Sequence, residues 1–436
     1  MKPRIVHRGA PLLALLAAIA VACGSPPPTP AQTTRSSAGP TSAVSAGSTA
    51  IASATPAATP AASPDLTLYP RIEAQVEQLR QLSPKSTVAP TLLDEQGVRD
   101  WMTKAFQSSV DHKALAAESR LFIHMGLLPA GASLEQLELD LNSGQAIGFY
   151  DPDTKQLYLL SQSGSVGPEQ QLTFSHEFTH ALQDQNFGLD KLAIDTVDQG
   201  DRDLARTALP EGDATLSMTQ WAEAHMSLAD LLSVSLSSAS GPAADQLNKA
   251  PAILREDLMF PYLDGLAFVQ GIYIKGGWAA VNKLYSNPPN STSQILHPAL
   301  YAAGVNPIAQ KLPAIPAALG SGWTLAMQDT MGELQLRIWL EGAGTDAQKK
   351  AAASAVASWG GDRIGLYEGP NGAWAVVLKT QWRSTGGRTA FATGATQILE
   401  GINSPSVVCG DATHADIVIT SDQTALGAFA TCKVGE

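Results

Sequence analysis

The stretch Leu172-Thr-Phe-Ser-His-Glu-Phe-Thr-His-Ala-Leu-Gln-Asp-Gln185 contains two histidines four positions apart, with a glutamate directly after the first. On an α-helix, residues four apart lie on the same face, so His176 and His180 can reach one metal ion and Glu177 lies beside them. The opposite face carries apolar side chains at helical spacing: Phe174, Phe178, Ala181 and Leu182. The sequence therefore predicts a helix, beginning near Pro168, that presents a ligand pair and a base.

The alternative is an ordinary amphipathic helix that carries this HExxH pattern by chance. The chain has only eight histidines, and two of them at ligand spacing on the polar face of one helix favour a zinc site. In metallopeptidases the same pattern combines two zinc ligands with a glutamate that acts as a general base. We therefore expect zinc-dependent hydrolysis of peptide bonds, with Glu177 taking the proton from water.

A third zinc ligand remains to be identified, because a catalytic zinc ion usually has three protein ligands. The HExxHxxGxxH pattern is absent, since Gln183 and Asn186 occupy the glycine and third-histidine positions. The segments HEFTHALQDQ (176–185) and LPEGDA (209–214) resemble a group of secreted or lipid-anchored zinc metallopeptidases of bacteria and archaea. That group carries HE(L/F)THALQDQ and an EG(D/E)A helix, and it is of the gluzincin type, in which a downstream helix supplies a carboxylate ligand.

This resemblance implies a zinc ion bound by His176, His180 and Glu211, with Glu177 as the catalytic base. Glu211 follows Pro210, which suits the first turn of a helix, so a second helix is expected to begin near residue 208. Most of the chain beyond residue 140 resembles the group. The further matching segments are FPYLDG (260–265), GGW (276–278), NSTSQILHP (290–298) and WGGDR (359–363).

Several residues are candidates for supporting roles at the zinc site. Asp213 is the alternative third ligand. If it is not a ligand, its expected role is to cap the start of the second helix. A histidine that binds a metal through one ring nitrogen usually donates a hydrogen bond from the other ring nitrogen to an acceptor. Some gluzincins have an aspartate four positions after the glutamate ligand, but this chain has Thr215 there, so Asp184 or Asp213 is expected to be the acceptor. His297 is the first candidate for the oxyanion donor and Tyr262 the second; a surface turn histidine is the alternative for His297.

The composition indicates which partners to expect. The net charge is −12, and no Lys/Arg cluster appears outside the first eight residues, which argues against binding to nucleic acid. The predicted partner is a protein or peptide substrate. A lipoprotein that uses zinc only for structure or for binding a partner is the alternative function. The intact Glu177 favours an enzyme, because a structural zinc site needs no base.

The amino terminus has the layout of an export signal. Basic residues in the first eight positions precede an apolar run from Leu12 to Ala22, which predicts a signal peptide over residues 1–22. The run is too short to span a bilayer comfortably. The end of the run, Ala20-Val-Ala-Cys23, resembles a bacterial lipoprotein signal, although Ala20 replaces the usual leucine. The resemblance implies a lipid on Cys23 and anchoring to the outer face of the cell membrane; a secreted protein with an incidental cysteine is the alternative.

The segment after Cys23 consists almost wholly of Ser, Thr, Ala, Pro and Gly, so residues 23–64 are expected to be the anchor and a disordered tether. The two remaining cysteines, Cys409 and Cys432, are predicted to form a disulfide in an exported protein. Two reduced thiols are the alternative. No cysteine spacing indicates a zinc site.

The pattern of the remaining chain predicts an α+β protein with two folded domains. The first is a zincin-like, mainly helical catalytic domain over residues 65–306 with a β-hairpin at 146–160, and a solvated acidic loop is expected at 187–206. A linker rich in proline and glycine follows at 307–322, and a small α+β domain at 323–436. Helices are predicted at 66–82, 98–106, 115–125, 331–340, 347–359 and 389–401, and strands at 364–368, 374–382 and 415–420.

Overall fold

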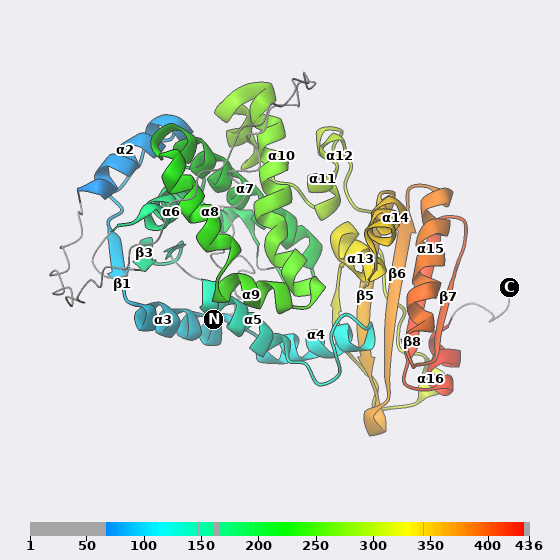
Figure 1. The fold of residues 1–436 in the computed structure, drawn as a ribbon. Helices are drawn as coiled ribbons and strands as arrows, with labels where there is room; N and C mark the ends of the chain where they lie inside the picture. Colours follow the sequence, from blue (N-terminus) through cyan, green and yellow to red (C-terminus); the bar gives the residue numbers. More distant parts are fainter. Residues whose placement is uncertain (1–66, 146–147, 161–165, 195, 343, 431–436) are drawn as a thin grey trace, which may run out of the picture.

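The computed structural model describes residues 67–430, apart from 146–147, 161–165, 195 and 343. The protein has a mixed α+β fold, which confirms the predicted class. A mainly helical part with a small sheet lies on the left in Figure 1, and a five-stranded sheet covered by helices lies on the right. The candidate metal ligands all belong to the helical part.

The first elements form a helical layer and a small sheet. They are α2 (Leu68–Arg80), β1 (Pro90–Leu93), α3 (Glu95–Ser109), α4 (His112–His124), α5 (Leu134–Gln145), β2 (Gly148–Asp151) and β3 (Gln156–Leu160). The three helices predicted from apolar spacing correspond to α2, α3 and α4. The predicted hairpin is β2–β3, and β1 adds to it in parallel with β3, which leaves β2 at the edge of the sheet.

The central elements contain the site and the helices that support it. They are α6 (Pro168–Phe187), η1 (Leu189–Leu192), α7 (Gly200–His225), α8 (Leu228–Ala239), α9 (Pro242–Lys249), α10 (Ala252–Leu284), α11 (Thr292–Leu296) and α12 (Pro298–Ala302). As predicted, Pro168 occupies the first turn of α6. Residues 172–179 and 181–184 of α6 are buried, so neighbouring elements enclose this helix on every side.

The start of α7 differs from the prediction. The helix begins at Gly200, so residues 200–206 are helical rather than part of a loop, and Pro210 lies inside the helix. A proline within a helix costs about 3 kcal/mol, and packing offsets this cost because α7 is buried along much of its length. A Cβ atom on Gly212 would lie 2.3 Å from the carbonyl carbon of Gly265, so α7 and α10 are in backbone contact.

The C-terminal part is an antiparallel sheet with strand order β4-β5-β6-β8-β7. Its elements are η2 (Ala317–Leu319), β4 (Thr324–Asp329), α13 (Gly332–Glu341), α14 (Asp346–Val356), β5 (Trp359–Glu368), η3 (Pro370–Gly372), β6 (Trp374–Trp382), α15 (Thr385–Glu400), β7 (Ser406–Gly410), β8 (His414–Thr420) and α16 (Gln423–Phe429). The predicted helices and strands of this region are present, and β5 begins earlier than predicted. The sequence patterns did not reveal β4, β7 or α16.

Side chains of the sheet alternate between two hydrophobic clusters, as period-two strands require. On β6, Val376 and Leu378 join the core that continues into the helical part, whereas Ala375 and Val377 face a smaller cluster with Phe429 of α16. The core with Val376 extends to Tyr69 of α2 and Phe174 of α6. The two parts of the protein therefore share one continuous hydrophobic core.

The segment predicted as a linker, 307–322, packs on the outer face of the sheet. Leu312, Ile315 and Leu319 contact the cluster that contains Tyr367, and the Tyr367 hydroxyl donates to the carbonyl oxygen of Pro313 at 2.6 Å. The segment therefore covers the sheet rather than merely joining two domains.

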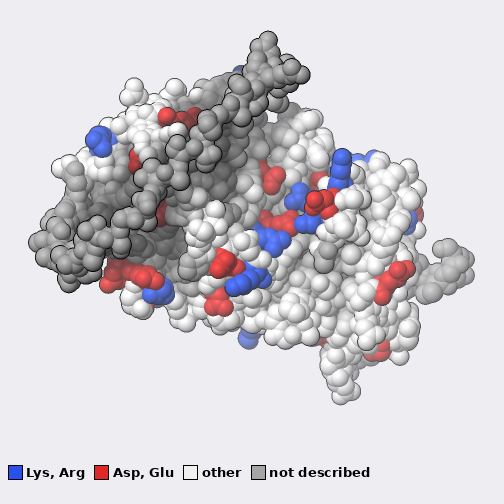
Figure 2. Space-filling view, in the orientation of Figure 1, with Lys and Arg blue, Asp and Glu red and all other residues white. Residues whose placement is uncertain are grey.

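Charged side chains of both signs lie close together on the face shown in Figure 2, with Lys and Arg among Asp and Glu. Within the described residues, no helix is long and apolar enough to cross a membrane. The predicted signal peptide, Cys23, the tether and Cys432 lie outside the described residues. Because Cys432 is the proposed partner of Cys409 in β7, their disulfide stays a prediction.

Candidate metal centre

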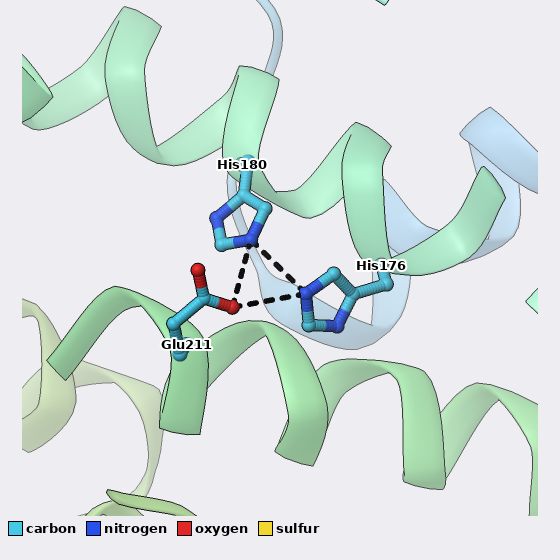
Figure 3. Close-up of side chains that lie close together, drawn as sticks. All are labelled: His176, His180 and Glu211. Carbon is cyan, nitrogen blue, oxygen red and sulfur yellow. Dashed lines mark hydrogen bonds and ion pairs between the residues drawn. The ribbon is translucent and has the colours of Figure 1, made fainter. Parts of the chain in front are cut away.

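Three side chains from two helices point toward one another in the helical part (Figure 3). His176 and His180 extend from consecutive turns of α6, and Glu211 extends from α7, which lies beside it. The two Nε2 atoms lie 3.0 Å apart. The Oε2 atom of Glu211 lies 3.2 Å from His176 Nε2 and 3.3 Å from His180 Nε2. The structure therefore brings together the three residues that the sequence proposed as metal ligands.

The spacing of these atoms fits a zinc ion. Zinc binds nitrogen and oxygen ligands at about 2.0–2.2 Å in a tetrahedral arrangement, which places neighbouring ligand atoms roughly 3.4 Å apart. The three observed separations are close to that value. Two imidazole nitrogens and one carboxylate oxygen are also the donor set of catalytic zinc sites that leave a fourth position open.

Burial and charge set the pKa values of this group. Burial disfavours the charged form of Glu211, but the neighbouring His180 and His176 outweigh it and lower the pKa of Glu211 to about 2. Burial likewise opposes the charging of His180, but Glu211 outweighs it and raises the pKa of His180 to about 9. Burial dominates at His176 and lowers its pKa. At neutral pH Glu211 is therefore ionised and pairs with a protonated His180, so a metal ion bound here would displace that proton.

Gln183 orients one of the histidines. Its Oε1 atom lies 2.9 Å from Nδ1 of His180, and its Nε2 donates to the carbonyl oxygen of Pro210 at 3.0 Å. A proton on Nδ1 leaves the Nε2 atom of His180 free to bind a metal. The expectation that Asp184 or Asp213 supports the histidines is wrong for His180. Gln183 follows His180 by three residues on the same helical face, which is the sequence signal that could have identified it.

Asp213, the alternative third ligand, is engaged elsewhere. Both of its oxygens accept from Arg80 of α2, at 2.6 and 2.8 Å, and one also accepts from the Tyr285 hydroxyl at 2.7 Å. Arg80 also donates to Asn282 at 2.8 Å. Asp213 therefore joins α7 to α2 and α10, and Glu211 is left as the carboxylate that faces the histidines. No local sequence pattern indicates Arg80, because it lies 133 residues from Asp213.

Glu177 lies on α6 between the two histidines. Its Oε2 atom accepts the backbone N–H of Tyr150 in β2 at 2.7 Å. Burial raises the pKa of Glu177 to about 8, although the charge on His180 and the hydrogen bond from Tyr150 act in the opposite direction. The residue is 3% exposed, so this carboxylate has the buried environment of a general base.

The two candidate oxyanion donors occupy different places. His297 lies at the junction of α11 and α12, where its Nε2 pairs with Oε1 of Glu333 in α13 at 2.7 Å. The structure does not group His297 with the three candidate ligands. Tyr262 of α10 is buried, and its ring centroid lies 6.2 Å from that of His176. Of the two candidates, Tyr262 is therefore the one beside the metal centre.

A family model described as a domain of unknown function (DUF8575) matches residues 324–432. The matched segment contains the strands β4 to β8 and the helix α16. It therefore covers the C-terminal sheet and not the candidate metal centre. No curated protein and no solved structure matches the chain.

Proposed function

We propose that the protein is a zinc-dependent peptidase. The observation that carries the proposal is the convergence of His176 Nε2, His180 Nε2 and Glu211 Oε2 within 3.3 Å of one another, with Glu177 on the same helix as the histidines. When bound, a zinc ion supplies Lewis acidity, which polarises a carbonyl group and acidifies water. The alternative of a structural zinc site is less favoured, because such a site usually has a fourth protein ligand and no base.

The side chains of this chain supply the remaining chemistry. Glu177 takes a proton from the attacking water and returns it to the leaving amine. Gln183 holds the tautomer of His180 in which Nε2 is free. Tyr262 is the candidate donor to the developing oxyanion. The predicted substrate is a protein or peptide.

The test compares zinc content and peptidase activity in Glu177→Gln and in wild type. Glutamine has the size of glutamate but cannot accept the proton, so the variant should bind zinc as wild type does. Its hydrolysis of a peptide library should fall by roughly 10² to 10⁴-fold. Glu169→Gln, at the start of the same helix, is the matched control and should retain activity. A zinc-loaded wild type that cleaves no peptide would instead support the binding or scaffold alternative.

The cellular location is a separate proposal. The amino-terminal pattern supports export and attachment of a lipid to Cys23, which would hold the protein at the outer face of the cell membrane. Replacing Cys23 by serine should then release the protein into the medium. Equal retention of both forms in the membrane fraction would contradict the anchor.

A further inference from the structure

Asp184, one turn after His180 on α6, connects this helix to the β2–β3 hairpin. Its Oδ2 atom accepts from the Tyr150 hydroxyl at 2.8 Å and from Lys155 Nζ at 2.6 Å. Its Oδ1 atom accepts the backbone N–H of Leu189 at 3.1 Å. The Asp184 side chain is 2% exposed. One oxygen of this buried carboxylate therefore fastens the hairpin, and the other binds the start of η1.

Tyr150 contacts α6 at two points seven residues apart. Its hydroxyl donates to Asp184, and its backbone N–H donates to Oε2 of Glu177. Tyr150 lies in β2, the edge strand of the small sheet, so this N–H points away from the neighbouring strand β3. The hydroxyl contact therefore fixes the distance between the backbone of β2 and the carboxylate of Glu177.

Lys155 supports the same arrangement from the hairpin turn. Its backbone φ is 59°, a left-handed conformation that glycine and asparagine adopt with less strain. Its ammonium group lies against Asp184 and balances the charge that Tyr150 also contacts. Lysine is an unfavourable residue for this left-handed backbone position, but its side chain forms the ion pair with Asp184. This indicates that the ion pair is important for the hairpin.

We propose that Asp184, Tyr150 and Lys155 form a clamp that positions Glu177 for catalysis, an inference that rests on the proposed peptidase function. The clamp holds the Tyr150 amide against Oε2 and so restricts rotation of the Glu177 side chain. The second oxygen, Oε1, is left for the proton transfer. A base must be held within a fraction of an ångström of its working geometry, and a hydrogen-bonded backbone amide does this better than a free side chain.

The test is Tyr150→Phe, which removes the hydroxyl and keeps the ring. Tyr158→Phe is the matched control, because Tyr158 stacks on Phe149 in the same hairpin. In Tyr150→Phe, kcat should fall roughly 10- to 100-fold, as for a small misplacement of a catalytic group, while KM and zinc affinity stay within about twofold of wild type. Tyr158→Phe should match wild type. Asp184→Asn should resemble Tyr150→Phe and replaces it if that variant does not fold.

Hydrogen exchange of the Tyr150 amide, measured on the zinc-loaded protein, gives a readout that does not depend on activity. Exchange should accelerate in Tyr150→Phe, which loosens the clamp, and in Glu177→Ala, which removes the acceptor. The proposal is overturned if either variant exchanges at the wild-type rate, or if Tyr150→Phe retains the kcat of Tyr158→Phe. If zinc-loaded wild type cleaves no peptide, the proposed function fails instead, and the exchange rates still decide whether the hydroxyl holds the amide on Glu177.

Discussion

Arg80 and Asp213 form a two-point ion pair in which neither side chain is exposed to solvent, with distances of 2.6 Å from Nε to Oδ1 and 2.8 Å from Nη2 to Oδ2. The guanidinium also lies 4.3 Å from the ring centroid of Trp278. Asp213 is two residues after Glu211 on α7. The pair therefore fixes the rotation and height of α7 at the point where this helix presents the carboxylate to the histidines.

The first prediction separates the two acidic residues of α7. Asp213→Asn should lower the free energy of unfolding by roughly 3 to 5 kcal/mol, because Arg80 keeps a buried charge without its counterion. The folded variant should still bind zinc. Glu211→Gln should have the opposite profile, with weak zinc binding and a smaller loss of stability. Urea unfolding and zinc competition titrations measure both quantities. If Asp213→Asn lost zinc while Glu211→Gln retained it, Asp213 rather than Glu211 would be the metal ligand.

The second prediction concerns Gln183. Gln183→Ala removes the acceptor that holds the tautomer of His180, so the affinity for zinc should fall by roughly 10- to 100-fold. Gln185→Ala is the matched control, since Gln185 accepts from the backbone of Lys85 and Ser86 rather than from a histidine. Its zinc affinity should equal that of wild type. Equal affinities in all three proteins would show that Gln183 does not support the ligand.

The parts of the site that depend on local spacing were predictable from the sequence. His176, Glu177 and His180 lie within five residues on one helix, so helical periodicity alone places them together. Glu211 required a resemblance, because no local pattern relates α7 to α6. Its proximity to both histidines in the structure agrees with that prediction.

The features that the sequence did not reveal depend on contacts between distant segments. Pro210 suggested a helix start, but contact between α7 and α10 at Gly212 and Gly265 lets the helix continue through the proline. The Arg80 contact joins residues far apart in the chain. The segment predicted as a linker covers the sheet because its apolar side chains pack against Tyr367. The spacing of prolines and glycines does not predict such packing.

The third prediction tests the two candidate oxyanion donors. Tyr262→Phe should lower kcat by roughly 10² to 10³-fold if its hydroxyl donates to the developing charge. His297→Asn should leave kcat within a few-fold of wild type, because His297 pairs with Glu333. Steady-state kinetics on a cleaved peptide decide between them. A larger loss of kcat in His297→Asn than in Tyr262→Phe would restore the histidine as the donor.

The last prediction concerns Asp201 at the start of α7, where the helical part meets the C-terminal sheet. Asp201 is 3% exposed and accepts from Thr292 through the backbone N–H at 3.0 Å and the hydroxyl at 2.5 Å. Burial raises its pKa to about 8, and the nearby carboxylates Asp362 and Glu333 contribute, although the contacts with Thr292 oppose the shift. A buried carboxyl group therefore stays protonated in the folded protein at pH values where the unfolded chain has lost that proton.

Linkage gives the sign of the effect. The ordinary pKa of Asp201 is 3.8 and its folded value is about 8, so within this window the folded state binds a proton that the unfolded state does not. The stability contributed by this group is full below pH 3.8 and is lost as the pH rises through about 8.

Asp201→Asn keeps an oxygen acceptor for Thr292 and cannot ionise. Between about pH 5 and about pH 8, the free energy of unfolding should therefore fall less steeply with pH in the variant than in wild type. Asp203, whose pKa is raised to about 7 by burial, titrates in both proteins and cancels in the comparison. Asp362, whose pKa is raised to about 6 by burial, interacts with Asp201, so the difference in slope reports Asp201 together with its coupling to Asp362. Parallel slopes in urea unfolding would show that Asp201 is already ionised in the folded state.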